Sequence, residues 1–321
     1  MIHALFAAAL AALTQVAYAQ GGYPSRPITM VVGFAPGGGT DTVARIVAKK
    51  LGDAVGQTVI VENKAGAGGT VATHQVARSA PDGYTILLGS IGSLAVAPHI
   101  IAKLPYDPLR DLAPITMAVE FPNVIVVQNA LPAKTLAEFV QLAKANPGTI
   151  GYGSSGVGGI GHLAGALLAI TAGIDIVHIP YKGIPFAVPA AIAGEVQLTF
   201  SGIASSQAHV KAGRLKALAI GGPARSPLMP EVPTFAEQGY PEVETHAWFG
   251  LFVPAGSPRA AVDRIQRDVA AILNDPAFRD REIVGKGYDL VASTPEAFAV
   301  YLVRDREARG RAVKISGARG E

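Results

Sequence analysis

Short apolar runs alternate with segments of helical periodicity in the first third of the chain. The run at 28–34 (ITMVVGF) leads into a segment that is rich in proline and glycine, which is typical of a buried strand. The segments that follow are a helix at 43–51, a strand at 58–61, a helix at 71–79 and a strand at 84–88. This β-α-β-α-β order predicts a parallel sheet with right-handed crossovers.

The pattern begins again at residue 123, after a proline-rich stretch at 104–122. A second proline-rich stretch, 223–241, precedes the apolar run at 248–253. The predicted strands are 123–127, 149–153, 176–179, 196–200, 215–220 and 248–253, and the predicted helices are 135–145, 162–171, 259–273 and 295–309. Two α/β modules joined by extended crossings near 121–127 and 246–253 are the simplest arrangement of these segments.

The amino terminus has the pattern of a secretory signal peptide. An apolar run, Leu5 to Leu13, is followed by the small-x-small sequence Ala17-Tyr18-Ala19, which predicts cleavage after Ala19. The run is preceded by His3 and by no Lys or Arg, so an amphipathic helix or a misassigned start is the alternative. No other apolar stretch approaches the roughly 20 residues of a membrane span, and we expect a soluble, exported protein.

Composition excludes several classes of protein and site. Half of the residues are apolar and only 16% are charged, which excludes intrinsic disorder. The chain has no cysteine, which excludes a disulfide scaffold, thiolate metal sites, thiol catalysis and a lipid-anchored cysteine. A net charge of +3 without a basic run argues against a nucleic-acid partner. The seven histidines lack metal-ligand spacing, so neither a metal nor a cofactor is expected.

The candidate chemistry lies in two glycine-rich loops, each between a strand and a helix. The first loop is 34–41 (FAPGGGTD), where glycines let the backbone approach a ligand and the helix start offers free N–H groups to an anion. A tight turn without a ligand is the alternative. Asp41 is interpreted as a cap that competes for these donors, so a carboxylate would meet loop amides or bridging waters.

The second loop is 153–161 (GSSGVGGIG), which contains a formal GxGxxG pattern. A dinucleotide site also needs an acidic residue at the end of the next strand, but that strand ends in Pro180-Tyr181-Lys182. The hydroxyls of Ser154 and Ser155 favour a small anion instead. Lys182 could attract that anion or simply lie on the surface.

Catalytic patterns are sparse. The sequence contains no GxSxG, HExxH or phosphate-loop motif. His162, at the start of a helix, is interpreted as a packed histidine that bonds the second loop, and Trp248 as a packing residue. An exported hydrolase or isomerase would need a nucleophile or base among Ser154, Ser155, His162 and Ser201.

Several strings, spread in order over nearly the whole chain, resemble one family. They are YPSRPITMVVGFAPGGGTDTVAR, VIVENKAGAGGTVAT, APDGYTILLGS, LPYDP, HIPYKG and FGLFVPAGSP. These strings are similar to the periplasmic receptors of tripartite tricarboxylate transporters, also called Bug solute-binding proteins. The resemblance implies a type II-like "Venus flytrap", with two α/β domains, each a mostly parallel sheet flanked by helices, and two crossover strands as hinge. It places domain 1 at 20–122 and 249–321, and domain 2 at 123–248.

The resemblance implies binding without catalysis. A monomeric periplasmic receptor would capture a small carboxylate-bearing solute between its domains and deliver it to a permease with one large and one small membrane subunit. A sensor that signals without transport is a further alternative. The ligand-contacting positions that it implies are Phe34, Ala35, Pro36, Gly37, Gly38, Gly39, Thr40, Asp41, Ser90, Ser93, Ser154, Ser155, Gly156, Gly158, His162, Tyr181, Lys182, Gly183 and Ser201.

One departure from the family pattern bears on the solute. Many relatives carry Asp-Asn after the strand VQLTF, where this chain has Ser201-Gly202. Without that acid, an ammonium-bearing amino acid is disfavoured, and an uncharged or purely acidic solute is favoured.

Overall fold

The computed structural model describes residues 22–243 and 245–319. The predicted signal peptide, 1–19, lies outside the described residues. Within the described part of the chain, no helix combines the length and the apolar character needed to cross a membrane.

The first sheet contains the predicted β-α-β-α-β unit. Its strands run in the order β2-β1-β3-β9-β4, with β10 on the outer edge of β4. The first three strands are parallel to one another, and β9 is antiparallel to both β3 and β4. The strands are β1 (Ile28–Val32), β2 (Val59–Asn63), β3 (Thr85–Ser90), β4 (Leu112–Gln128), β9 (His246–Pro254) and β10 (Asp289–Leu290).

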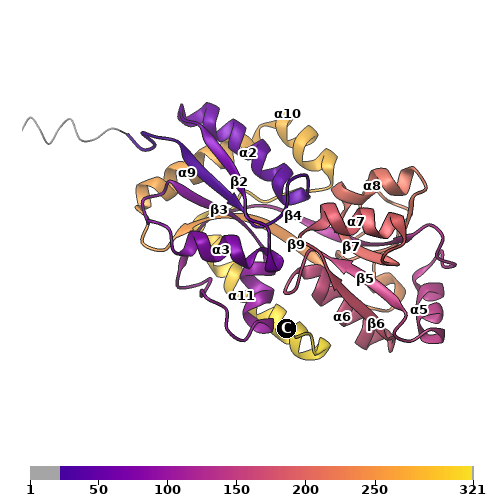
Figure 1. The fold of residues 1–321 in the computed structure, drawn as a ribbon. Helices are drawn as coiled ribbons and strands as arrows, with labels where there is room; N and C mark the ends of the chain where they lie inside the picture. The colour runs from indigo at the N-terminus through magenta and orange to yellow at the C-terminus, as the bar shows by residue number, and fades with distance from the viewer. Residues whose placement is uncertain (1–21, 244, 320–321) are drawn as a thin grey trace, which may run out of the picture.

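Helices cover both faces of this sheet. Figure 1 shows α2 and α9 above it, and α3 and α11 below it. The long helices are α2 (Gly39–Val55), α3 (Thr70–Ala77), α9 (Arg259–Asn274) and α11 (Pro295–Ser316). Shorter helical segments are η1 (Ala67–Gly69), η2 (Gly92–Val96), α4 (Ala97–Ile100), α10 (Pro276–Phe278), η4 (Arg279–Ile283) and η5 (Val284–Lys286).

The second sheet forms the other lobe in Figure 1. Strands β5 and β6 are parallel, as are β5 and β7, whereas β7 and β8 flank the second half of β4 in antiparallel pairing. The strands are β5 (Ile150–Ser154), β6 (Ile176–Pro180), β7 (Leu198–Gly202) and β8 (Leu215–Ile220). The helical segments are α5 (Leu136–Ala145), α6 (Ile160–Ala172), α7 (Ile184–Ala193), α8 (Ile203–Lys211) and η3 (Ala236–Gln238).

Strand β4 belongs to both sheets. Its residues up to Pro122 pair with β9, and its residues from Asn123 pair with β7 and β8. The proline-rich stretch 104–122 is therefore partly a strand, which the sequence pattern did not predict. Proline is tolerated at strand irregularities, and the register of β4 shifts next to Pro114. The chain returns to the first sheet at His246, where β9 begins.

Two helices of the second lobe were also missed. Helix α7 (IPFAVPAAIA) has proline in its interior and apolar residues at every position, so it shows no amphipathic period. Helix α8 (IASSQAHVK) is short and rich in small polar residues. The fold class predicted from the sequence, an α/β protein with mostly parallel sheets flanked by helices, is confirmed.

The single tryptophan joins β9 to the C-terminal helix. Trp248 is 1% exposed, packs edge-on against Phe298, and donates its indole N–H to Asp305 at 2.9 Å. Its packing role agrees with the sequence-based interpretation.

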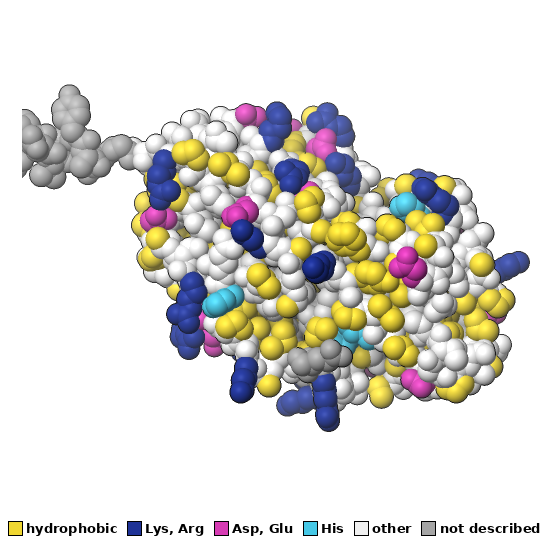
Figure 2. Space-filling view, in the orientation of Figure 1, with side chains coloured by type: hydrophobic (Ala, Val, Ile, Leu, Met, Phe, Trp, Pro, Cys, Tyr) yellow, Lys and Arg dark blue, Asp and Glu magenta, His cyan; other side chains and the backbone are white. Residues whose placement is uncertain are grey.

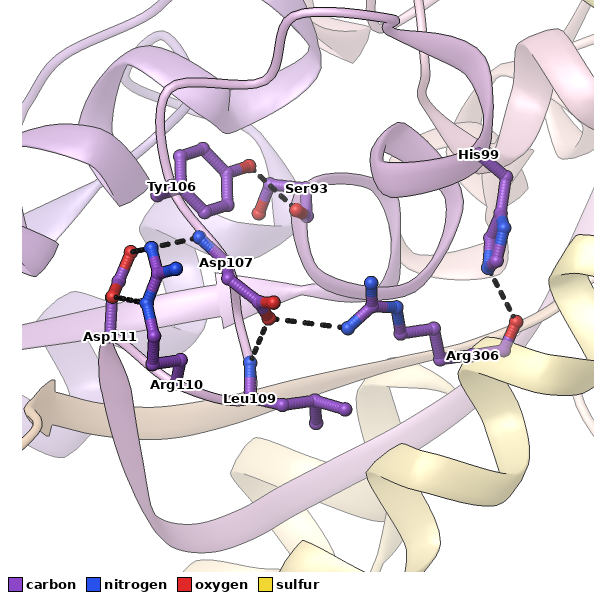
Figure 3. A network of polar contacts seen from close by, with 8 residues as sticks. All are labelled: Ser93, His99, Tyr106, Asp107, Leu109, Arg110, Asp111 and Arg306. Carbon is purple, nitrogen blue, oxygen red and sulfur yellow. Dashed lines mark hydrogen bonds and ion pairs between the residues drawn. The ribbon is translucent and has the colours of Figure 1, made fainter.

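The LPYDP loop is tied to the same helix (Figure 3). The Tyr106 hydroxyl donates to the Ser93 carbonyl at 2.6 Å, and Arg306 of α11 lies 3.3 Å from an Asp107 carboxylate oxygen. The His99 ring bonds the Arg306 carbonyl at 2.8 Å. These contacts hold the segment after β3 against α11.

Charged side chains are scattered over the face drawn in Figure 2, with acidic and basic residues interspersed. Hydrophobic side chains gather where the two lobes meet. The lobes therefore approach each other through an apolar zone.

Candidate functional site

A cavity of about 70 Å³ lies where the two lobes meet. Both sheets contribute to it, and β4 and β9 form part of its wall. Six of the predicted residues line it, namely Phe34, Gly38, Gly39, Thr40, Ser90 and Ser155. Three more lining residues, Gly159, Ile160 and Gly161, lie in the predicted second loop but were not singled out as ligand contacts. The lining residues that sequence reasoning did not single out are Ile91, Gly92, Phe121, Asn123, Ile184, Pro185, Phe200, Gly202, Ser205, Ala247, Phe249 and Tyr288.

Four helices begin at this cavity, and glycine precedes each of them. The N-cap residues of α2, α6, α7 and α8 are Gly38, Gly159, Gly183 and Gly202, and none makes a side-chain cap hydrogen bond. The first N–H groups of a helix have no partner within the helix, and the N-terminus carries a partial positive charge. Backbone donors and four favourable dipoles thus meet at one cavity.

Asp41 takes one of the loop donors, but it does not occupy the cavity. It is buried in the first turn of α2, and its carboxylate accepts the Gly37 N–H at 2.9 Å. The same carboxylate accepts hydrogen bonds from Arg45 and Asn63 at 2.9 Å each. Although burial opposes it, hydrogen bonding lowers the pKa of Asp41, so the side chain stays ionised. It stabilises the loop and leaves the donors of Gly38, Gly39 and Thr40 unclaimed by its side chain.

Ser90 presents a buried hydroxyl to the cavity. The residue is 6% exposed, and its Oγ has no hydrogen-bond partner in the described structure. A buried hydroxyl without a partner costs free energy, so an unpaired one lining a cavity indicates a ligand site. Ser201 has a similarly unpartnered, fully buried Oγ, but it does not line the cavity.

Tyr288 adds a second hydroxyl, beside the start of α2. A Cβ atom placed on Gly39 would lie 2.7 Å from the Tyr288 hydroxyl oxygen, so only glycine leaves room for it there. Burial raises the pKa of Tyr288, which keeps the hydroxyl protonated and able to donate. No sequence pattern indicated this residue, because it comes from the irregular segment before β10.

Aromatic rings form one wall of the cavity. The Phe121 ring lies 4.7 Å from the Phe249 ring and 5.3 Å, edge to face, from the Tyr288 ring (centroid distances). Phe34 and Phe200 also line the space. Of the described residues that line the cavity, none carries a formal charge.

Two predicted residues, Ser154 and His162, form a polar cluster with His178 that does not line the cavity. The Ser154 Oγ lies 2.6 Å from the His178 Nε2, and the His178 ring stacks on the His162 ring with centroids 4.0 Å apart. Burial, with a smaller effect of His162, lowers the pKa of His178 to about 3, and burial lowers the pKa of His162. His162 Nδ1 accepts the Gly158 N–H at 3.4 Å, as its interpretation as a packed histidine predicts. Ser154 and His178 are as close as a catalytic nucleophile and its base would be. Ser154 is fully buried, however, so a substrate cannot reach its hydroxyl.

The remaining predicted residues do not line the cavity either. Ser93 is buried and bonded to Thr73, and Lys182 is exposed beside a surface hollow with Tyr181. Ala35, Pro36, Gly37, Asp41, Gly156, Gly158, Gly183 and Ser201 also lie outside the lining. The sequence pattern that could have pointed to more of the lining is a glycine before a helix, because Gly159 and Gly202 share the strand–glycine–helix pattern of the first loop.

The lobes touch through glycines next to the cavity. A Cβ on Gly68 would lie 2.5 Å from the Val157 carbonyl oxygen, and one on Gly156 would lie 2.7 Å from the Gly68 nitrogen. A Cβ on Gly92 would lie 3.2 Å from the Gly159 Cα. Backbone from the first lobe thus packs directly on backbone from the second.

Comparison with known proteins places the chain in a family. The model of the tripartite tricarboxylate transporter family receptor matches residues 43–315. The chain belongs to this family. Protein BugT of Bordetella pertussis is 36% identical over 298 residues, which cover 92% of this chain and 91% of BugT.

Solved structures agree with the assignment to the receptor family. The periplasmic binding protein BugD superposes with a TM-score of 0.88 at 34% identity, covering 93% of this chain and 100% of BugD. An R. palustris protein solved with adipate gives a TM-score of 0.89 at 30% identity, covering 92% and 99% of the two chains. This receptor is thus a solute-binding protein of the Bug type, as the sequence resemblance predicts.

Proposed function

We propose that the receptor binds a small carboxylate-bearing solute in the cavity between its lobes and delivers it to a tripartite permease with one large and one small membrane subunit. The observation that carries this proposal is the convergence of four glycine-capped helix starts on a cavity without charged side chains. Such a site attracts one anion through backbone donors and dipoles. The adipate-bound relative supports a carboxylate as that anion.

The carboxylate is held by the first turn of α2 and by hydroxyl donors. The N–H groups of Gly39 and Thr40, the Tyr288 hydroxyl and the Ser90 hydroxyl supply hydrogen bonds to its oxygens, in part through water. Hydrogen bonds to a charged group contribute about 1.5–3 kcal/mol each, which is enough for tight binding without a basic residue.

Binding closes the two domains. Domain 1 comprises 20–122 and 249–321, domain 2 comprises 123–248, and the crossings in β4 and β9 act as the hinge. Because elements of both domains line the cavity, the solute has a higher affinity for the closed form and shifts the population toward it. The permease then recognises the closed form.

The receptor acts in the periplasm, as a monomer, after removal of residues 1–19. It works by binding alone, with no catalytic step, metal or cofactor. An exported enzyme would turn over the bound acid, and a sensor would keep its response after deletion of the permease genes.

Calorimetric titration with carboxylic acids tests this function, after mass spectrometry has identified solutes that co-purify with the receptor. We expect saturable binding of at least one acid and no binding of its amide. Equal binding of acid and amide, or turnover of the acid, would contradict the proposal.

Replacement of Tyr288 by Phe tests the anchor. The variant keeps the ring and loses one donor, so the Kd for the acid should rise about tenfold or more. Tyr106→Phe is the matched control, because its buried hydroxyl donates to Ser93 away from the cavity. The control should lower the melting temperature and leave the Kd unchanged.

A further inference from the structure

The polar groups of the cavity are uncharged donors, and none of the described lining side chains can pair with a second carboxylate as an ion pair. Its donors are the backbone N–H groups at the helix starts and a few hydroxyls, of which Ser90 is buried without a partner. The Asn123 side chain donates one of its two N–H groups to the Thr245 carbonyl at 2.7 Å and is uncharged. No lining side chain in the described structure offers a positive charge.

The rest of the wall is apolar. Phe121, Phe249 and Tyr288 contact one another, and their rings come from β4, β9 and the segment before β10. Phe200 and Ile184 come from the second lobe. The faces of aromatic rings carry partial negative charge, so they disfavour a second carboxylate and favour an apolar body. An unpaired charge buried against such a wall loses its hydration without compensation.

The glycine at position 202 is part of this arrangement. A Cβ there would lie 3.3 Å from the Phe121 ring, so the glycine allows the ring to lie close to the start of α8. A larger residue at this position would press on the ring and reduce the apolar surface.

We propose that the solute is a monocarboxylic acid with an apolar body, and that di- and tricarboxylates are poor ligands. This inference rests on the proposed function and narrows it. The carboxylate lies at the helix starts, and the hydrocarbon part contacts the Phe121, Phe249 and Tyr288 rings. Burial of the hydrocarbon part contributes to affinity here. In a site with a basic residue, an ion pair with a second carboxylate would make that contribution.

Matched pairs of acids test this inference on the full-length mature receptor. Hexanoate and adipate share a six-carbon chain and differ by one carboxylate, as butyrate and succinate do for four carbons. Benzoate adds an aromatic body, and hexanamide lacks the charge. We expect at least one monoacid to bind at least tenfold more tightly than the diacids, and hexanamide not to bind.

Two substitutions test the aromatic wall. Phe121→Leu should weaken binding of the preferred monoacid at least fivefold. Phe252→Leu is the control, because Phe252 is fully buried on β9 but does not line the cavity. Its Kd should stay within twofold of the unmodified receptor, whatever its stability.

The outcomes separate this inference from the proposed function. Binding of adipate or succinate as tight as that of the matched monoacid would overturn the inference and leave carboxylate binding intact. Failure of every monoacid, diacid and tricarboxylate to bind would overturn both. An unchanged Kd in Phe121→Leu would also contradict a solute body held by the aromatic wall.

Discussion

At the scale of single residues, two serines of the receptor have buried hydroxyls without a hydrogen-bond partner among the described residues, one at the cavity and one away from it. Ser90 and Ser201 are both buried with an unpartnered hydroxyl, but only Ser90 lines the cavity. Replacement of either by Ala removes an unpaired polar group and should raise the free energy of unfolding of the solute-free receptor by about 1 kcal/mol.

The two variants should differ in solute binding. Ser90→Ala should raise the Kd about tenfold, because it removes a donor to the carboxylate, and Ser201→Ala should leave the Kd unchanged. Chemical denaturation and calorimetry measure the two quantities. A loss of affinity in both variants would show that the effect is structural and does not arise at the cavity.

The stacked histidines make stability depend on pH. The pKa of His178 is lowered to about 3 in the folded receptor, mainly by burial, whereas an unfolded histidine titrates near pH 6.5. The unfolded chain therefore binds more protons between these values. The contribution of His178 to the free energy of unfolding is highest above pH 6.5 and falls as the pH decreases toward 3.

Replacement of His178 by Gln should reduce this dependence. Urea denaturation between pH 7.5 and pH 4.5 should show a smaller loss of stability in the variant than in the unmodified receptor. Ser154→Ala is the control, because it removes the 2.6 Å contact and keeps the buried ring. The control should be less stable at every pH with an unchanged slope; an unchanged slope in His178→Gln would contradict the assignment.

At the scale of elements, the two lobes contact each other through backbone at glycine positions, and the proposed closure relies on this contact. Gly68 has φ +61° and lies against the Val157 carbonyl, and Gly173 has the same φ with nothing within 4 Å of its Cβ position. Alanine at either position pays a similar backbone cost, but only Gly68→Ala inserts a methyl group between the lobes.

Gly68→Ala should therefore weaken solute binding at least tenfold, and Gly173→Ala should not. Both variants should unfold at similar denaturant concentrations if the lobes fold independently of their contact. Calorimetric titration of the pair checks the first expectation. Solute binding by Gly68→Ala with the Kd of the unmodified receptor would rule out closure onto this contact.

The elements were predictable from the sequence where the apolar period was clear. The strands of both sheets, apart from β10 and the first half of β4, and the helices at 135–145 and 259–273 agree with the structure, because each has one buried face or a continuous apolar run. Strand β4 was shortened because its first half contains proline, and α7 was missed because it has no polar face. Lining residues could be predicted only where the loop that carries the sequence pattern also lines the cavity.

The rest of the cavity lining depends on tertiary structure. Phe121 and Phe249 face each other because β4 and β9 pair across more than a hundred residues of sequence. Tyr288 reaches the start of α2 from a segment without periodic pattern. Such proximity is a property of the sheet order, which a single sequence does not encode locally.

At the scale of the whole molecule, solute binding should make the receptor more compact. The two lobes share β4, approach through glycine loops, and both line the cavity, so the proposed closure would bring them together around a solute. Small-angle scattering should therefore give a smaller radius of gyration with a saturating acid than without it. An unchanged radius with bound solute would contradict domain closure.

The glycine-capped helix starts have a consequence for the diversification of these receptors. A contact made by a peptide N–H is the same for almost any residue that occupies the position, whereas the aromatic wall is made of side chains that one substitution can replace. Substitutions in the aromatic wall therefore change which apolar body is accepted, one step at a time, while the backbone N–H groups continue to bind the carboxylate. Receptors of this kind can therefore change their solute specificity by substitution of wall residues while every intermediate form still binds a carboxylate.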